Sequence, residues 1–232
     1  MDKIAKKPLD PPAQAVVDRL HTRSSRQLIL SAPSILASIA RSRLRDGTWD
    51  STSTESGKAL LADKLVALAP TKAALVYQLC RATNAERVVE AGTSFGVSTI
   101  YLAAAVRDNG GAEPHVFGTE HEPAKVAAAR KNLAEAGVSD YVEILEGDLR
   151  ETLRTIEGPI DFMLVDIWIP MALPALRIVT PLLRPGALVV CDNVISGFSE
   201  YREYLEFVRD PDGPFESITI PGQGGLELSR KR

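Results

Sequence analysis

The sequence predicts one α/β domain built on a mostly parallel, doubly wound sheet. Three observations support this. A glycine turn joins a buried strand to a helix, short apolar runs alternate with helical patterns downstream, and acidic residues follow the predicted strands. The chain has 232 residues, 45% of them hydrophobic, which suits one domain with a large core.

The glycine turn lies in the segment RVVEAGTSFGVSTIYLA, residues 87–103. Val88 and Val89 begin a buried strand, Glu90 lies at its end, residues 92–96 form the turn, and a helix starts at Val97. The glycines let the backbone pass close to a ligand, and the helix start offers free N–H groups to an anion.

The spacing of the glycines, E-x-G-x-x-x-G, differs from the G-x-G-x-x-G of dinucleotide-binding turns. A pyrophosphate would also be poorly placed beside the charge of Glu90. The turn better suits a ligand that carries both an ammonium and a carboxylate, and S-adenosylmethionine (SAM) is such a ligand.

Composition excludes several classes of protein. The net charge of −3 and the lack of a basic stripe argue against a nucleic-acid partner. No apolar run reaches the roughly 18 residues of a membrane span. The N-terminal MDKIAKKPLDPP has no apolar core behind it, so we expect no secretory signal. Cys80 and Cys191 lie in apolar surroundings and are expected to be buried thiols in a reducing, cytoplasmic compartment.

The N-terminal quarter of the chain is expected to form an arm and helices. The polar stretch 46–57 is expected to be a loop, either a lid over a site or a connector. We therefore divide the chain into an N-terminal part, 1–57, that covers substrate or contacts a second copy, and a main domain, 58–232. Helices are predicted over 12–30, 34–44, 58–68 and 71–82, with Pro70 separating the last two.

The main domain alternates strands and helices as far as a final hairpin through PGQGG. After the glycine turn, strands are predicted over 115–119, 141–145, 160–165, 186–191, 215–220 and 226–229, and helices over 123–137, 149–156, 173–183 and 200–208.

An acidic residue follows each of the predicted parallel strands. Because ligands bind at the carboxyl ends of such strands, these side chains are expected to share one rim. A cation, ribose hydroxyls and amine groups would compensate so much negative charge. The residues are Glu90, Glu120, Asp148, Asp166 and the pair Asp192-Asn193.

Each of these residues also has a simpler interpretation. Glu120 either binds both hydroxyls of a ribose or caps the helix that starts at Pro123. Asp148 either contacts a ligand or caps the next helix, and Asp192-Asn193 either binds a ligand or marks a turn. Trp168 is either a pocket wall or a core residue.

The chain resembles the metal-dependent class I O-methyltransferases, the family of catechol and caffeoyl-CoA methyltransferases. The resemblance covers roughly residues 56–230. It rests on four motifs together: VVEAGTSFGVST at 88–99, FGTEHEP at 117–123, FMLVDIW at 162–168 and LVVCDNV at 188–194.

The resemblance implies a seven-stranded, Rossmann-like SAM-binding fold, a homodimer and a small-molecule oxygen acceptor. It implies a hard ion such as Mg²⁺, because the matching ligands are oxygen donors. By position, it assigns SAM contacts to Glu90, Gly92, Thr93, Ser94, Gly96, Ser98, Glu120, Asp148 and Asp166, the catalytic metal triad to Asp166, Asp192 and Asn193, and the substrate pocket to Trp168, Ile169 and Tyr201.

Two positions depart from the family pattern. Ile169 stands where catechol-type members carry a lysine that helps deprotonate the acceptor hydroxyl, and GQGG at 222–225 lacks an acid that many relatives carry. A phenol, with a pKa of about 10, needs deprotonation that a metal ion can assist, whereas a carboxylate, with a pKa of about 4, needs no base.

We therefore expect a SAM-dependent O-methyltransferase with a hydroxyl acceptor, and we keep a carboxylic acid acceptor as the alternative. Three further alternatives are a nitrogen acceptor, a non-catalytic SAM-binding protein and an NAD(P)-dependent oxidoreductase.

Overall fold

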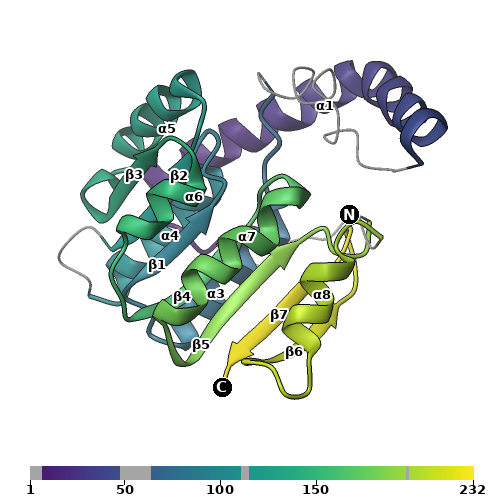
Figure 1. Cartoon of the computed structure of the whole chain (residues 1–232). Helices are drawn as coiled ribbons and strands as arrows, with labels where there is room; N and C mark the ends of the chain where they lie inside the picture. Colours follow the sequence, from purple (N-terminus) through teal and green to yellow (C-terminus); the bar gives the residue numbers. More distant parts are fainter. Residues whose placement is uncertain (1–6, 48–63, 111–114, 197–198) are drawn as a thin grey trace.

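The computed structural model describes residues 7–47, 64–110, 115–196 and 199–232. Its seven-stranded sheet has the order β3-β2-β1-β4-β5-β7-β6 (Figure 1). Strands β1 to β5 are parallel, and β7 runs antiparallel to both β5 and β6. This confirms the expected fold class. The strands are β1 (Val88–Ala91), β2 (Val116–Glu120), β3 (Val142–Glu146), β4 (Ile160–Val165), β5 (Leu183–Asp192), β6 (Phe215–Ile220) and β7 (Leu226–Lys231).

Helices cover both faces of the sheet, and each face has its own apolar core. The core on one face joins the sheet to the start of α1, to α3, to α4 and to α5. The core on the other face joins it to α6, α7 and α8. The helices are α1 (Pro11–Asp46), α3 (Pro70–Ala82), α4 (Val97–Asp108), α5 (Pro123–Glu135), α6 (Leu149–Thr152), α7 (Ile169–Val179) and α8 (Arg202–Arg209).

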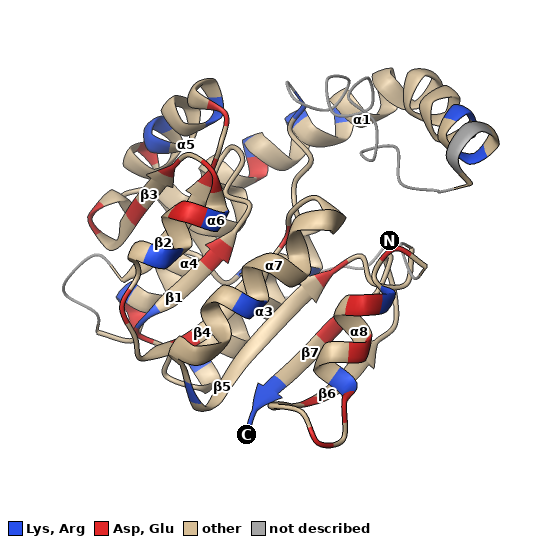
Figure 2. Ribbon diagram, in the orientation of Figure 1, with Lys and Arg blue, Asp and Glu red and all other residues tan. Residues whose placement is uncertain are grey.

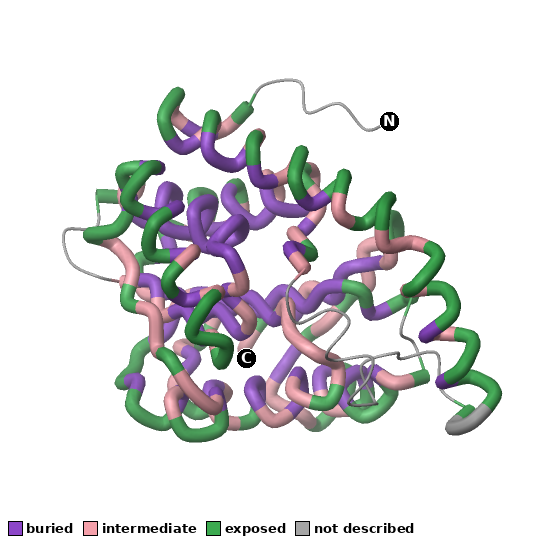
Figure 3. Tube along the Cα trace, turned by 90° about the horizontal axis from the view of Figure 1, so that it is seen from above, coloured by how far each residue is buried: buried purple, intermediate pink, exposed green. Residues whose placement is uncertain are grey.

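Helix α1 is continuous, so the prediction of two separate helices over 12–30 and 34–44 was wrong. Asp10 caps its start by accepting from the backbone N–H of Ala13 at 3.1 Å. Pro33 removes one helical hydrogen bond, but Ile29, whose carbonyl loses its partner, is 74% exposed, so water can replace it. The first half of α1 is buried along one side, whereas exposed positions dominate its second half (Figure 3).

The segment before α3 also differs from its prediction. Residues 64–69 are not helical, although a helix was predicted over 58–68, and α1 supplies their hydrogen-bond partners instead. The backbone N–H of Leu65 donates to Gln27 at 3.0 Å, and that of Ala67 donates to Ser24 at 3.3 Å. Residues 58–63 and nearly all of the predicted 46–57 loop lie outside the described residues. The division of the chain at residue 57 stays a prediction.

Helix α7 begins four positions before its prediction. Pro170 lies in its first turn, where a proline is favourable because that N–H has no helical partner. The helix ends at Val179, a 3₁₀ turn follows, and β5 already begins at Leu183, the last residue of the predicted helix.

Acidic and basic residues are interspersed over the described elements (Figure 2). No described helix combines the length and the apolar character that crossing a bilayer requires.

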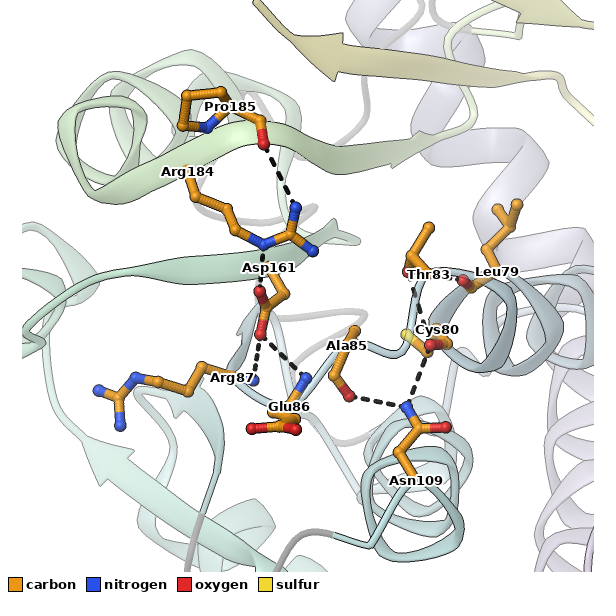
Figure 4. A network of polar contacts seen from close by, with 10 residues as sticks. All are labelled: Leu79, Cys80, Thr83, Ala85, Glu86, Arg87, Asn109, Asp161, Arg184 and Pro185. Carbon is orange, nitrogen blue, oxygen red and sulfur yellow. Dashed lines mark hydrogen bonds and ion pairs between the residues drawn. The ribbon is translucent and has the colours of Figure 1, made fainter.

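A polar network fixes the amino ends of β1, β4 and β5, far from the predicted ligand edge (Figure 4). The Asp161 carboxylate accepts from the backbone N–H groups of Glu86 and Arg87, at 2.9 and 2.8 Å, and from the Arg184 guanidinium. Nearby, the Asn109 amide donates to the carbonyls of Cys80 and Ala85. Burial alone would raise the pKa of Asp161, but the N–H groups of Glu86 and Arg87 and the Arg184 guanidinium together lower it.

Replacing Asp161 with alanine is expected to destabilise the fold by about 1–3 kcal/mol, because the N–H groups of Glu86 and Arg87 lose their acceptor. Since the pKa of Asp161 is lowered on folding, its contribution is present above the unfolded pKa of about 3.9 and is lost as the pH falls through the folded value. Urea unfolding at pH 7 and pH 3 measures both effects. A difference between the variant and the native chain that did not shrink at pH 3 would contradict this account.

Candidate active site

The glycine turn is shaped by its contact with β4. Gly92 has φ +103°, and a Cβ atom there would lie 2.1 Å from the carbonyl oxygen of Asp166. The backbone N–H of Asp166 in turn donates to the carbonyl of Ala91 at 3.0 Å. Gly96, with φ +85°, is the N-cap residue of α4, whose first N–H groups face the turn. The turn thus presents backbone to a ligand directly beside Asp166.

Glu90 is fully buried at the end of β1. The hydroxyls of Thr93 and Thr99 donate to its Oε2 atom, at 3.0 Å for Thr93, and Oε1 has no hydrogen-bond partner among the described residues. Burial raises the pKa of Glu90, while the hydroxyls of Ser98, Thr99 and Thr93 oppose the rise. A buried oxygen without a partner is costly, so a donor group on a ligand would stabilise it.

Glu120, the last residue of β2, reaches across to the glycine turn. Its Oε2 accepts from the backbone N–H of Ser94 at 2.8 Å, and its Oε1 accepts from those of His121 and Glu122, at 2.8 and 2.9 Å. A carboxylate has about four acceptor positions, so one remains for a ligand hydroxyl. Glu122, not Glu120, is the N-cap residue of α5, so the structure does not support the simpler interpretation of Glu120 as a helix cap.

Asp166 and Asp192 lie at the ends of the neighbouring strands β4 and β5. The pKa of Asp166 is raised mainly by burial and also by the nearby charges of Asp192 and Glu90, whereas the charge of Lys72 lowers it. Burial also raises the pKa of Asp192, against the effect of Lys72. Asn193 follows with φ +62°, a left-handed conformation that asparagine tolerates. The parallel strands have therefore brought the expected acidic residues together.

Lys72 is a site residue that the sequence analysis missed. It lies on α3, and its ammonium forms an ion pair with Asp192 in which both side chains are almost fully buried. Its position could have been noticed, because Lys72, Val76 and Cys80 recur at the four-residue spacing of one buried helix face. A lysine on such a face needs a partner.

Similarity to known proteins agrees with this geometry. Residues 89–194 match the model of a family described as "Methyltransferase domain". The solved structure of cofactor-bound Rv0187 from MTB has a TM-score of 0.66 and 29% identity, over 72% of this chain and 82% of that chain. Residues 89–194 therefore resemble a methyltransferase domain, and the chain shares the fold of a solved cofactor-bound protein.

The chain is also similar to two curated catechol O-methyltransferases. The one from Mycobacterium tuberculosis is 35% identical over 133 residues, which are 57% of this chain and 59% of that protein. The one from Niastella koreensis is 35% identical over 125 residues, 52% of this chain and 53% of that protein. The chain thus spans little more than half the length of these relatives. These matches confirm the resemblance inferred from the four motifs and give no support to a dinucleotide oxidoreductase.

A pocket opens beside the glycine turn. It is lined by residues 65–68, by turn and helix residues between Gly92 and Ser98, and by Asp166. Segment 65–68, which α1 holds in place, therefore forms one wall of the pocket. No sequence motif indicated that these residues would line the pocket.

The residues present fit a hard cation. Glu90, Asp166 and Asp192 supply three carboxylates near a single ammonium, that of Lys72, and no described residue donates a hydrogen bond to the Asp166 carboxylate. No group of three His, Cys, Asp or Glu side chains among the described residues is arranged to hold a metal ion. A divalent ion would therefore need the amide oxygen of Asn193 as well as the two aspartates.

Asp148 caps α6, as its simpler interpretation predicted. Its carboxylate accepts from the backbone N–H of Arg150 at 2.9 Å and pairs with the Arg150 guanidinium. These donors lower the pKa of Asp148 to about 2. Its contact with adenine stays a prediction.

The three predicted substrate residues differ in their surroundings. Trp168 is half-buried at the N-cap of α7, two residues after Asp166, and Ile169 packs partly against the second core. Tyr201 is only 3% exposed and packs edge-on against Tyr204, with ring centroids 6.0 Å apart. An acceptor would have to enter the core to touch Tyr201. The substrate roles of all three stay predictions.

Proposed function

We propose that this protein is a methyltransferase that transfers the methyl group of SAM to an oxygen atom of a small molecule. The observation that carries the proposal is the arrangement of Glu120, the glycine turn and Asp166 along one edge of the sheet. Glu120 would accept from a ribose hydroxyl, the turn would hold the methionine end, and Glu90 would accept from a donor on the ligand. Cofactor-bound Rv0187 and the two catechol O-methyltransferases support this assignment.

A hydroxyl acceptor of the catechol or phenol kind is favoured by the charge of the site. Burial already raises the pKa values of Glu90, Asp166 and Asp192, so this is a poor environment for a further anion, and a carboxylic acid would be expected to bind together with an added cation. Asp166, Asp192 and Asn193 would hold a divalent ion, which would lower the pKa of a bound hydroxyl. The protein itself would hold the acceptor oxygen beside the SAM methyl group, and this positioning would lower the barrier to transfer.

Methyl transfer from labelled SAM tests the proposal. A panel of catechols and a panel of small carboxylic acids are each assayed with Mg²⁺ and with EDTA. We expect transfer to catechols that EDTA abolishes. Transfer to carboxylic acids that survives EDTA would replace the hydroxyl proposal with the carboxylic acid alternative. Binding of SAM without transfer to any acceptor, amines included, would favour a non-catalytic protein.

We also propose a homodimer in which residues 1–57 contribute to the contact or to the substrate pocket. The exposed apolar side chains of α1 support it: Ile29, Leu30, Leu36 and Leu44 are 65–88% exposed. Light scattering that gave the mass of a single chain would rule the dimer out.

A further inference from the structure

The ammonium of Lys72 is fully occupied by acceptors from two segments distant in sequence. It pairs with Asp192 Oδ1, donates to the carbonyl of Gln223 at 2.6 Å and reaches that of Gly225 at 3.5 Å. An ammonium has three N–H donors, and three acceptors surround it. Lys72 therefore has neither a free donor nor a free lone pair for an acceptor molecule, and it does not replace the base that is missing at Ile169.

The turn 222–225 depends on its glycines, above all Gly224 and Gly225. All four of its residues have positive φ: Gly222 +108°, Gln223 +46°, Gly224 +88° and Gly225 +80°. A Cβ atom at Gly224 would lie 2.6 Å from Asn193 Oδ1, and one at Gly225 would lie 2.5 Å from Ile195 Cγ1. The turn therefore needs glycine both for its backbone and for its contact with the segment after β5.

The carbonyls of this turn hold the segment that carries Asp192 and Asn193. The backbone N–H of Asn193 donates to Gly225 at 3.0 Å, and those of Ile195 and Ser196 donate to Gly224 at 2.8 and 3.1 Å. Asp192 Oδ1 accepts from the N–H of Asn193 at 2.7 Å as well as from Lys72. Asp192 Oδ1 is thus already hydrogen-bonded within the protein.

We propose that Lys72 and the turn 222–225 together position Asp192 and Asn193 for the acceptor side of the site. Lys72 is a positioning residue, because its ammonium binds both the Asp192 carboxylate and the carbonyls of the turn. The acceptor side is the part of the site formed by Asp166, Asp192 and Asn193, where the proposed function places the methyl acceptor, so this inference rests on that function. It predicts that loss of Lys72 lowers methyl transfer to the acceptor and loosens the backbone of residues 193–196. The SAM contacts, which lie on β1 and β2, should be unaffected.

The test compares Lys72→Met, Lys72→Ala and Gly224→Ala with Lys131→Met, an exposed lysine on α5 that serves as the control. Hydrogen exchange reports the amides of Asn193, Ile195 and Ser196, calorimetry reports SAM affinity, and labelled SAM reports transfer. For both Lys72 variants and Gly224→Ala we expect faster exchange at these amides and a loss of about 10- to 100-fold in kcat/KM for the acceptor, the usual cost of losing a supporting contact. The dissociation constant for SAM is expected to stay within about twofold, because an effect limited to the acceptor side leaves the SAM contacts intact.

Chemical rescue separates a positioning charge from mere packing. Ethylammonium should restore transfer by Lys72→Ala, whereas potassium chloride at the same ionic strength should not. Unchanged exchange and kinetics in Lys72→Met, or a parallel loss of SAM binding, would overturn the proposal. If Lys72→Met does not fold, Gly224→Ala and the rescued Lys72→Ala decide the question. If the native chain transfers no methyl group, the proposed function fails, but the exchange comparison still decides whether Lys72 positions the segment.

Discussion

Replacing Gly92 with alanine is expected to abolish SAM binding and to destabilise the fold by about 3–5 kcal/mol, from overpacking and left-handed backbone strain together. The new methyl group would lie 2.1 Å from the carbonyl oxygen of Asp166, so the ends of β1 and β4 would have to separate. That separation would break the hydrogen bond from Asp166 to Ala91 and move the turn that holds the ligand. Urea unfolding and SAM calorimetry measure the two effects.

Gly137→Ala is the matched control. Gly137 also has a positive φ, +69°, but no atom lies within 4 Å of its would-be Cβ. It should therefore cost only about 1 kcal/mol, from backbone strain alone, and leave SAM affinity unchanged. Equal losses in the two variants would show that strain, not the contact with β4, explains the need for glycine at position 92.

Replacing Glu120 with alanine is expected to weaken SAM binding by about 100-fold, which corresponds to roughly 2.7 kcal/mol. The loss combines the hydrogen bond proposed to a ribose hydroxyl with the contact that fixes the N–H of Ser94 in the glycine turn. Bonds to a charged acceptor are each worth about 1.5–3 kcal/mol, so one or two of them account for the effect. Calorimetry with SAM measures it.

Glu122→Ala, two residues away, provides the comparison for Glu120. Its side chain makes no capping bond at the start of α5, so SAM affinity should stay within about twofold of the native value, as for a surface substitution. If Glu120→Ala bound SAM as well as Glu122→Ala does, Glu120 would have only a structural role in the turn.

Much of the fold and half of the site followed from local patterns. Strand β4 was predicted with its observed bounds, and the segment from Val88 to the start of α4 was close, because glycines and apolar runs are local signals. The meeting of Asp166 and Asp192 was also predictable, since parallel strands end on one edge of the sheet.

What could not be predicted depends on contacts between distant segments. Lys72 meets Asp192 across 120 positions of sequence, and no spacing within either segment indicates the pair. Residues 64–68 were predicted to be helical, but side chains of α1 accept from the N–H groups of Leu65 and Ala67 instead. The two helices predicted over 12–30 and 34–44 form one helix, because an exposed helix can lose the hydrogen bond that Pro33 removes to water.

The position of β7 also has a consequence for the order in which a newly made chain can assemble. β7 fills the place between β5 and β6, although it is made after both. A ribosome that has released the chain only as far as β6 leaves β5 with an open edge of unpaired N–H and C=O groups, which invites pairing with other chains. The carbonyls that hold residues 193–196 also arrive only then, with the turn before β7. The SAM side of the site can therefore form during synthesis, whereas the acceptor side is completed last.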